Sequence, residues 1–164
     1  MELRTRRLTF REMTDADLDA IAGLLGDPRV MTYYPRPKTR AESQGWIDWN
    51  KTNYREHGFG LWILETPDGE FVGDCGLTMQ QVEGRPEVEV GYHVRFALQG
   101  QGLATEAAKA SRAFAEGRGI ERLVAIINPE NVPSQRVAEK IGLSYEKTAA
   151  ASGGQAEIYS ASLG

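Results

Sequence analysis

The stretch EVGYHVRFALQGQGLATEAAKA, residues 89–110, passes from an apolar run through two spaced glycines into an alanine-rich helical pattern. Glycines between a strand and a helix let backbone amides approach an anion, and the dipole of the following helix favours negative charge. The stretch therefore predicts a strand, an anion-binding loop over residues 99–104 and a helix. A phosphate or pyrophosphate is the natural guest of such a loop.

Two nucleotide-binding motifs are similar to this loop, and neither matches it. A dinucleotide site needs three glycines close to the strand end and an acidic residue at the end of the next strand, about 20 residues further on. Here RFALQ intervenes, the third glycine is absent and the next strand ends in IIN. A phosphate loop needs Lys followed by Ser or Thr after the second glycine, where Leu103 and Ala104 stand. A plain glycine-rich loop is the remaining alternative on this stretch alone.

Strand and helix patterns alternate on both sides of the stretch. Apolar–polar alternation and turn residues predict strands over residues 8–13, 59–65, 70–80, 87–94 and 122–128, with a closing hairpin of 143–150 and 155–163 around a turn at 152–154. Capping residues and apolar spacing predict helices over 14–25, 39–56 and 132–141, besides the one after the glycine loop. This order predicts one α+β domain over residues 1–164, with a mixed, mostly antiparallel central sheet of about seven strands and helices on both faces.

Composition narrows the class of protein. The formal charge of −4 argues against nucleic acid as a partner, and no apolar run approaches the ~18 residues that would span a membrane. The N-terminal sequence lacks the apolar core of a signal peptide, so a cytoplasmic location is expected. The small basic cluster is predicted to be solvated; it consists of Arg4, Arg6 and Arg7.

Cysteine and histidine are too few and too scattered to indicate a metal site. Cys75 is the only cysteine and lies within an apolar alternation, which predicts a small buried strand residue rather than a nucleophile. The two histidines, His57 and His93, are far apart in the sequence. We therefore expect no metal.

Residues 99–104, Gln-Gly-Gln-Gly-Leu-Ala, fit the Gln/Arg-x-x-Gly-x-Gly/Ala signature of the GNAT superfamily of N-acetyltransferases, and nearly the whole chain resembles that family. EVGYHV is similar to its fourth strand, ATEAAKA to the following helix, and residues 128–143 to its asparagine-rich loop and last helix. The branch resembled is that of the ribosomal-protein N-terminal acetyltransferases, which modify alanine or serine. The resemblance implies the acyl-CoA N-acyltransferase fold and acetyl-coenzyme A (acetyl-CoA) as cosubstrate, and it is compatible with a homodimer.

The resemblance also implies which residues hold acetyl-CoA. Amides of the loop would bind the pyrophosphate, and strand amides near Tyr92 and Val94 the pantetheine arm, where one of them could serve as the oxyanion donor. Asn131 would contact the pantetheine, with a plain helix N-cap as the alternative. The expected cofactor-binding residues are Tyr92, Val94, Gln99, Gly100, Gln101, Gly102, Leu103, Ala104, Thr105, Asn131 and Ser134.

Acetyl transfer to an amine requires a neutral amine. A lysine side chain of pKa ~10.4 costs roughly 4.6 kcal/mol to deprotonate at pH 7, whereas an α-amine near ~7.8 costs about 1 kcal/mol. Glu89, two residues before Gly91 on the strand that would border the thioester, is the first candidate base, directly or through water. Its alternative reading is an exposed strand carboxylate. His93 has the same strand parity and is the second candidate.

The leaving thiolate is where the sequence departs from many relatives. In much of the superfamily a tyrosine of the last helix protonates the sulfur, but Ala138 occupies that place here. The hydroxyl of Ser134 is the nearest substitute, with bracing of the helix start as its alternative role. A thiol of pKa near ~8.5 leaves as thiolate at a cost of about 2 kcal/mol at pH 7, so a strong acid is dispensable. The absent tyrosine keeps a second class open, a non-catalytic acyl-CoA binding or sensing domain.

The acceptor amine is expected in a pocket made by the first two helices and the loop between them. The amine could be a protein N-terminus, a polyamine, an amino acid or an antibiotic, and the charge pattern does not choose among these. Core packing is the alternative for each aromatic residue that could line the pocket: Tyr33, Tyr34, Trp46, Trp49 and Trp62.

Overall fold

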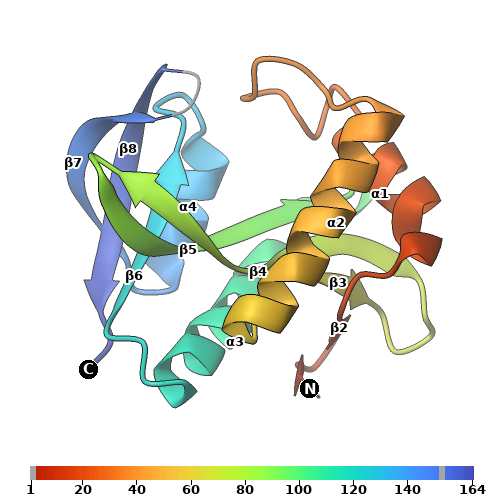
Figure 1. Ribbon diagram of the computed structural model, residues 1–164, viewed down its shortest axis with the longest axis horizontal. Helices are drawn as coiled ribbons and strands as arrows, with labels where there is room; N and C mark the ends of the chain where they lie inside the picture. Colours follow the sequence, from red (N-terminus) through yellow and green to blue (C-terminus); the bar gives the residue numbers. More distant parts are fainter. Residues whose placement is uncertain (1–2, 152–153) are drawn as a thin grey trace.

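A mixed sheet with one parallel pair of strands dominates the computed structural model, which describes residues 3–151 and 154–164 (Figure 1). Within these residues eight strands form the sheet in the order β1-β2-β3-β4-β5-β6-β8-β7. β5 and β6 are parallel and the other neighbours antiparallel. The strands are β1 (Leu3–Arg4), β2 (Thr9–Arg11), β3 (Leu61–Glu65), β4 (Phe71–Val82), β5 (Arg85–Val94), β6 (Arg122–Ile127), β7 (Ser144–Ala151) and β8 (Gly154–Ser162).

The predicted fold class is confirmed, with one strand more than the sequence pattern indicated. The additional strand is β1, whose two residues are too few to show any alternation. The first two residues of the predicted closing turn, Ser152 and Gly153, lie outside the described residues.

Four α-helices within the described residues cover the sheet: α1 (Leu18–Leu25), α2 (Arg40–His57), α3 (Leu103–Gly117) and α4 (Val132–Lys140). α1 and α2 pack together on one face, while α3 contacts β4 and β5 from the other face and lies against α4. None of these helices, as far as the described residues extend, is long and apolar enough to cross a membrane.

Helix ends follow the capping signals of the sequence, with one difference. α2 begins after Thr39, whose side chain accepts a hydrogen bond from Glu42 N at 3.1 Å, and ends at Gly58 in the left-handed conformation. Thr14 starts a 3-10 turn, η1 (Asp15–Asp17), and α1 proper begins only at Leu18. The side chain of Asp17 accepts from Thr14 N and thereby holds that turn.

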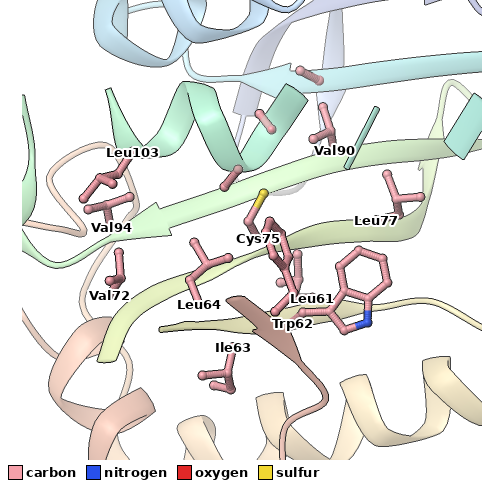
Figure 2. Close-up of a cluster of buried hydrophobic side chains, with 14 of the residues drawn as sticks. Leu61, Trp62, Ile63, Leu64, Val72, Cys75, Leu77, Val90, Val94 and Leu103 are labelled. Carbon is pink, nitrogen blue, oxygen red and sulfur yellow. The ribbon is translucent and has the colours of Figure 1, made fainter. Parts of the chain in front are cut away.

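Side chains of β3, β4 and β5 form the core between the sheet and its helices (Figure 2). Cys75 is fully buried there, as predicted. Trp62, which could have lined the acceptor pocket, is only 1% exposed, and its ring packs edge-on against Phe114 of α3 at 4.9 Å between centroids. That prediction is wrong, because Trp62 points to the α3 face while Ile63 points to the other (Figure 2).

The β4–β5 hairpin sets the register on which the site depends. The sequence suggested a connection over residues 82–86, but the two strands extend to a turn of only two residues, Glu83 and Gly84. Consequently Thr78 lies opposite Glu89 and Asp74 lies opposite His93.

Candidate active site

A cavity of about 800 Å³ opens where β5 and β6 separate. Within the described residues these two strands pair at one position, Glu89 with Val124, and beyond it they take different directions (Figure 1). Beyond Glu89, the edge of β5 that faces β6 therefore borders the cavity instead of a neighbouring strand. Such a gap exposes backbone amides in the middle of a sheet, where an extended ligand can pair with them.

Glu89 lies at the point of separation and lines the cavity. Its Oε2 accepts a hydrogen bond from Ile126 N of β6 at 2.9 Å. Burial raises the pKa of Glu89 to about 7, although this hydrogen bond and the nearby His93 ring oppose the rise. Glu89 is therefore half-buried and is not an exposed strand carboxylate. Because its pKa is about 7, the carboxyl group can take up and release a proton near neutral pH.

His93 belongs to a network that joins the sheet to the acceptor wall. Its Nδ1 lies 2.8 Å from Asp74 Oδ1, and its Nε2 lies 2.7 Å from the hydroxyl of Tyr34. The second oxygen of Asp74 accepts from Trp46 Nε1 at 3.0 Å. Asp74 is fully buried, and these partners satisfy both of its oxygens. The sequence reading did not single out Asp74, although a two-residue turn would have placed it opposite His93.

Tyr92 reaches the start of α4 from β5. Its hydroxyl lies 2.9 Å from the carbonyl oxygen of Ser134, to which it donates, and 3.0 Å from Ser134 Oγ. Asn131 Oδ1 accepts from Ser134 N at 3.2 Å, which confirms Asn131 as the N-cap of α4. Ala138 is fully buried and offers no polar group to the cavity. A tyrosine hydroxyl thus stands beside Ser134, but it comes from the sheet rather than from the last helix.

The glycine loop has the geometry of an anion site. Gly100 and Gly102 both adopt φ of 80°, a left-handed conformation that residues with a Cβ rarely adopt. α3 begins at Leu103, so its first amides have no partner within the helix. The loop does not line the cavity and lies beyond the opposite end of β5 from the hairpin turn.

Arg7 adds a positive charge beside this loop. Its Nη1 donates to the carbonyl of Gln101 at 2.9 Å, and its Nε forms an ion pair with Glu106 of α3 at 2.7 Å. A Cβ built on Gly102 would lie 3.5 Å from Arg7 Nη2. Arg7 is exposed, as expected for the N-terminal basic cluster, and it makes these contacts with the loop and α3 in addition. Amides, a helix N-terminus and a guanidinium together fit a pyrophosphate.

Four of the five predicted acceptor aromatics line the cavity: Tyr33, Tyr34, Trp46 and Trp49. They come from α2 and the loop before it. Asn128, which follows β6 on the opposite side of the cavity, donates a hydrogen bond to the carbonyl oxygen of Tyr33 in that loop at 3.0 Å. The lining also includes polar residues of β4 and β8 that the sequence pattern did not indicate: Thr78, Gln80, Gln81 and Gln155.

The cavity brings together some of the predicted site residues and leaves others apart. Those that line it, besides the aromatics, are Glu89, Tyr92, His93, Asn131 and Ser134. Val94 is buried in the core, and residues 99–105 form the separate loop and helix start described above. No group of three or more metal-ligating side chains occurs in the part of the chain that the structure describes.

Known proteins share this architecture. The acetyltransferase (GNAT) domain model matches residues 7–144. The uncharacterised Bacillus subtilis protein YkkB is 41% identical over 150 residues, covering 90% of this chain and 87% of YkkB. A crystal structure of an acetyltransferase from Agrobacterium tumefaciens is 29% identical, with a TM-score of 0.87 over 98% of this chain and 94% of that chain.

A ribosomal-protein L7/L12 α-N-acetyltransferase, solved in complex with coenzyme A, shares the fold with a TM-score of 0.80 at 17% identity, over 99% of this chain and 98% of that chain. The resemblance found in the sequence is thus confirmed at the level of family and fold. The match to the domain model covers well over half of the chain, and the chain therefore belongs to the GNAT family of acetyltransferases.

Proposed function

We propose that this acetyltransferase moves the acetyl group of acetyl-CoA directly to a primary amine, either a protein N-terminus or a small-molecule amine, within a ternary complex. The observation that carries the proposal is the position of Glu89. Its carboxyl group, with a pKa raised to about 7, lines the cavity at the point where the strands separate. A base of this pKa is half ionised at neutral pH, which suits proton abstraction from an amine.

Glu89 removes a proton from the attacking ammonium, directly or through a water molecule. His93 is the second candidate, but both of its nitrogens already have partners, Asp74 and Tyr34, so its geometry favours a role in holding the wall of the pocket. The nitrogen lone pair then forms the new C–N bond at the thioester carbon. Amides on the open edge of β5 are suited to stabilise the oxyanion.

Ser134 is the group that we assign to the sulfur. As the C–S bond breaks, the electron pair stays on sulfur, and the nitrogen gives its second proton to water so that a neutral amide results. The hydroxyl of Ser134 donates a hydrogen bond to the thiolate. Burial raises the pKa of Tyr92 above its ordinary range, so its hydroxyl remains protonated and positions Ser134 by donating to the carbonyl oxygen of that residue. The glycine loop and Arg7 would hold the pyrophosphate at the other end of β5.

A cytoplasmic location, one domain over the whole chain and a homodimer are further parts of this proposal, supported by the sequence pattern and the family resemblance alone. They can be checked by fractionation, by limited proteolysis and by light scattering. The proposed activity does not depend on them.

The direct test is release of free thiol from acetyl-CoA in the presence of an amine library, with mass spectrometry of the acetylated product. We expect turnover with at least one primary amine. A chain that binds acetyl-CoA but releases no thiol across a broad library would contradict direct transfer and favour the acyl-CoA binding or sensing alternative.

A further inference from the structure

The cavity has a charge pattern that acetyl transfer itself does not require. Aromatic rings form much of its wall, among them Tyr33, Trp46 and Trp49, and its carboxyl groups belong to Glu89 and Glu130. Among the described residues that line the cavity, none is a lysine or an arginine.

Two cations of the loop before α2 lie near the lining residues but do not line the cavity themselves. Arg36 forms a short ion pair with Glu42 at 2.6 Å, and Lys38 places its Nζ 5.1 Å from the ring centroid of Trp46. Neither residue lines the cavity. His93 does line it, but its two ring nitrogens are held by Asp74 and Tyr34, so it has no N–H left to offer to an anion.

These surroundings select against an anionic group beside the reacting nitrogen. A carboxylate on the neighbouring carbon, as in every free α-amino acid, would lose water on entry and meet Glu89 without a compensating cation. A second ammonium group or a neutral amide avoids that cost. A positive charge gains in addition from the aromatic faces and the two carboxyl groups.

We propose that the acceptor is a cationic amine with no carboxylate on the carbon beside the reacting nitrogen. Diamines, polyamines and the N-terminal residues of peptides have this chemistry, and the α-amine of a free amino acid does not. The inference rests on the proposed function, because it takes the cavity at Glu89 as the place where the amine reacts.

Two matched pairs of acceptors test it: agmatine against L-arginine, and L-phenylalaninamide against L-phenylalanine. kcat/KM is measured by thiol release and expressed per unprotonated amine, because the members of a pair differ in amine pKa. We expect the carboxylate-free member of the reacting pair to be preferred by about tenfold or more, equivalent to about 1.4 kcal/mol. Reaction of the agmatine pair indicates amines that carry a second cationic group, such as diamines and polyamines, and reaction of the amide pair indicates peptide N-termini.

A preference below about tenfold, with robust turnover, overturns the inference and leaves acetyl transfer intact. Absence of thiol release with these four compounds and with the broad amine library, while acetyl-CoA still binds, contradicts the proposed function and the inference together. The two failures are therefore distinguishable.

Charge substitution tests the physical cause. Gln80 lines the cavity on β4, and its strand parity is that of Thr78, which faces Glu89 across the hairpin. Gln80→Arg should therefore lower the preference for the carboxylate-free member about tenfold. Gln155→Arg, at an exposed lining position of β8, is the second variant if the first does not fold.

The matched control is Glu56→Gln, which makes the same change in net charge at the exposed end of α2 and should leave the preference unaltered. An unchanged preference in folded Gln80→Arg and Gln155→Arg would contradict an electrostatic origin. A shift of equal size in Glu56→Gln would do the same.

Discussion

A carboxyl group poised near neutral pH is the central feature at the residue scale. Glu89 is half-buried and receives one hydrogen bond, from Ile126 N, so its charged form is less stable than it would be in water. The same burial that destabilises the ion makes the group a better base. Burial of Glu89 therefore favours catalysis and lowers the stability of the folded protein when the carboxylate is charged.

Glu89→Gln removes the proton acceptor and leaves the shape of the side chain. The wild-type kcat/KM is expected to rise as pH increases through about 7, where Glu89 ionises. The variant should lose that rise and fall by about 100-fold at pH 7.5. The measurement is kcat/KM from pH 5.5 to 9 with an amine acceptor whose own pKa lies outside that range.

Glu87→Gln is the matched control, because Glu87 lies two residues earlier on β5 and pairs with Arg122 at 2.8 Å outside the cavity. An unchanged pH profile in Glu89→Gln would remove Glu89 as the base.

The pH dependence of thermal unfolding gives a second check on the pKa of Glu89. The folded-state pKa of Glu89 lies above its unfolded value, so its stabilising contribution is present at acid pH and is lost as pH rises through about 7. Glu89→Gln should therefore melt at a higher temperature than wild type at pH 8.

The hydrogen bonds between Tyr92 and Ser134 lead to a second prediction at this scale. Ser134→Ala and Tyr92→Phe should each lower kcat about tenfold. The double variant should lose little more, because both substitutions impair the same hydrogen bond, the one from Ser134 to the departing thiolate. The KM for acetyl-CoA should change by less than about twofold. Steady-state kinetics of the four proteins decides this. Fully additive losses would contradict a shared path.

At the scale of elements, the sequence was most informative where local chemistry determines structure. Glycines with positive φ, an asparagine N-cap and a helix stop are local requirements, so the glycine loop, α4 and the end of α2 could be predicted. Trp62 could not be assigned to a face, because both faces of β3 are covered and FGLWILE is apolar at nearly every position. Arg7 acts through a partner about 100 residues away, which no local pattern reveals. Asp74 pairs with His93 about 20 residues away, and only the correct length of the β4–β5 turn places the two opposite each other.

Gly102→Val tests the loop as an element. Valine cannot adopt φ of 80° without strain, and the distorted amides should weaken coenzyme A binding about tenfold or more. Gly119→Val is the control, because Gly119 has φ of 75° and open surroundings beyond the other end of α3. Both variants should lose stability. Isothermal titration with coenzyme A should show weaker binding in Gly102→Val alone, and equal affinity in the two variants would exclude the loop from the binding site.

For the whole molecule, the sheet consists of two parts that separate between β5 and β6, and the cavity lies in this gap, which we call the seam. Strands β1–β5 form the first part, and β6, β7 and β8 form the second. The order of elements in the sequence predicted this sheet, but the seam depends on how far two parallel strands diverge after their one paired position, Glu89 with Val124. Side-chain contacts within the described residues cross it at several places. Hydrogen bonds join Glu89 to Ile126, Tyr92 to Ser134 and Asn128 to Tyr33, and ion pairs join Glu87 to Arg122 and Glu83 to Lys147.

A ligand that lies in this seam should stabilise both parts together. At about 100 times its Kd, coenzyme A should add about 2.7 kcal/mol to the free energy of unfolding and raise Tm by roughly 5–10 °C for a chain of this length. The gain should shrink in Gly102→Val at the same concentration. Hydrogen exchange should slow in β5 and also in β6, because the pantetheine arm would occupy the gap between these strands. Protection confined to the glycine loop and the start of α3 would show that the nucleotide binds without entering the seam, and would contradict the proposed position of the thioester beside Glu89.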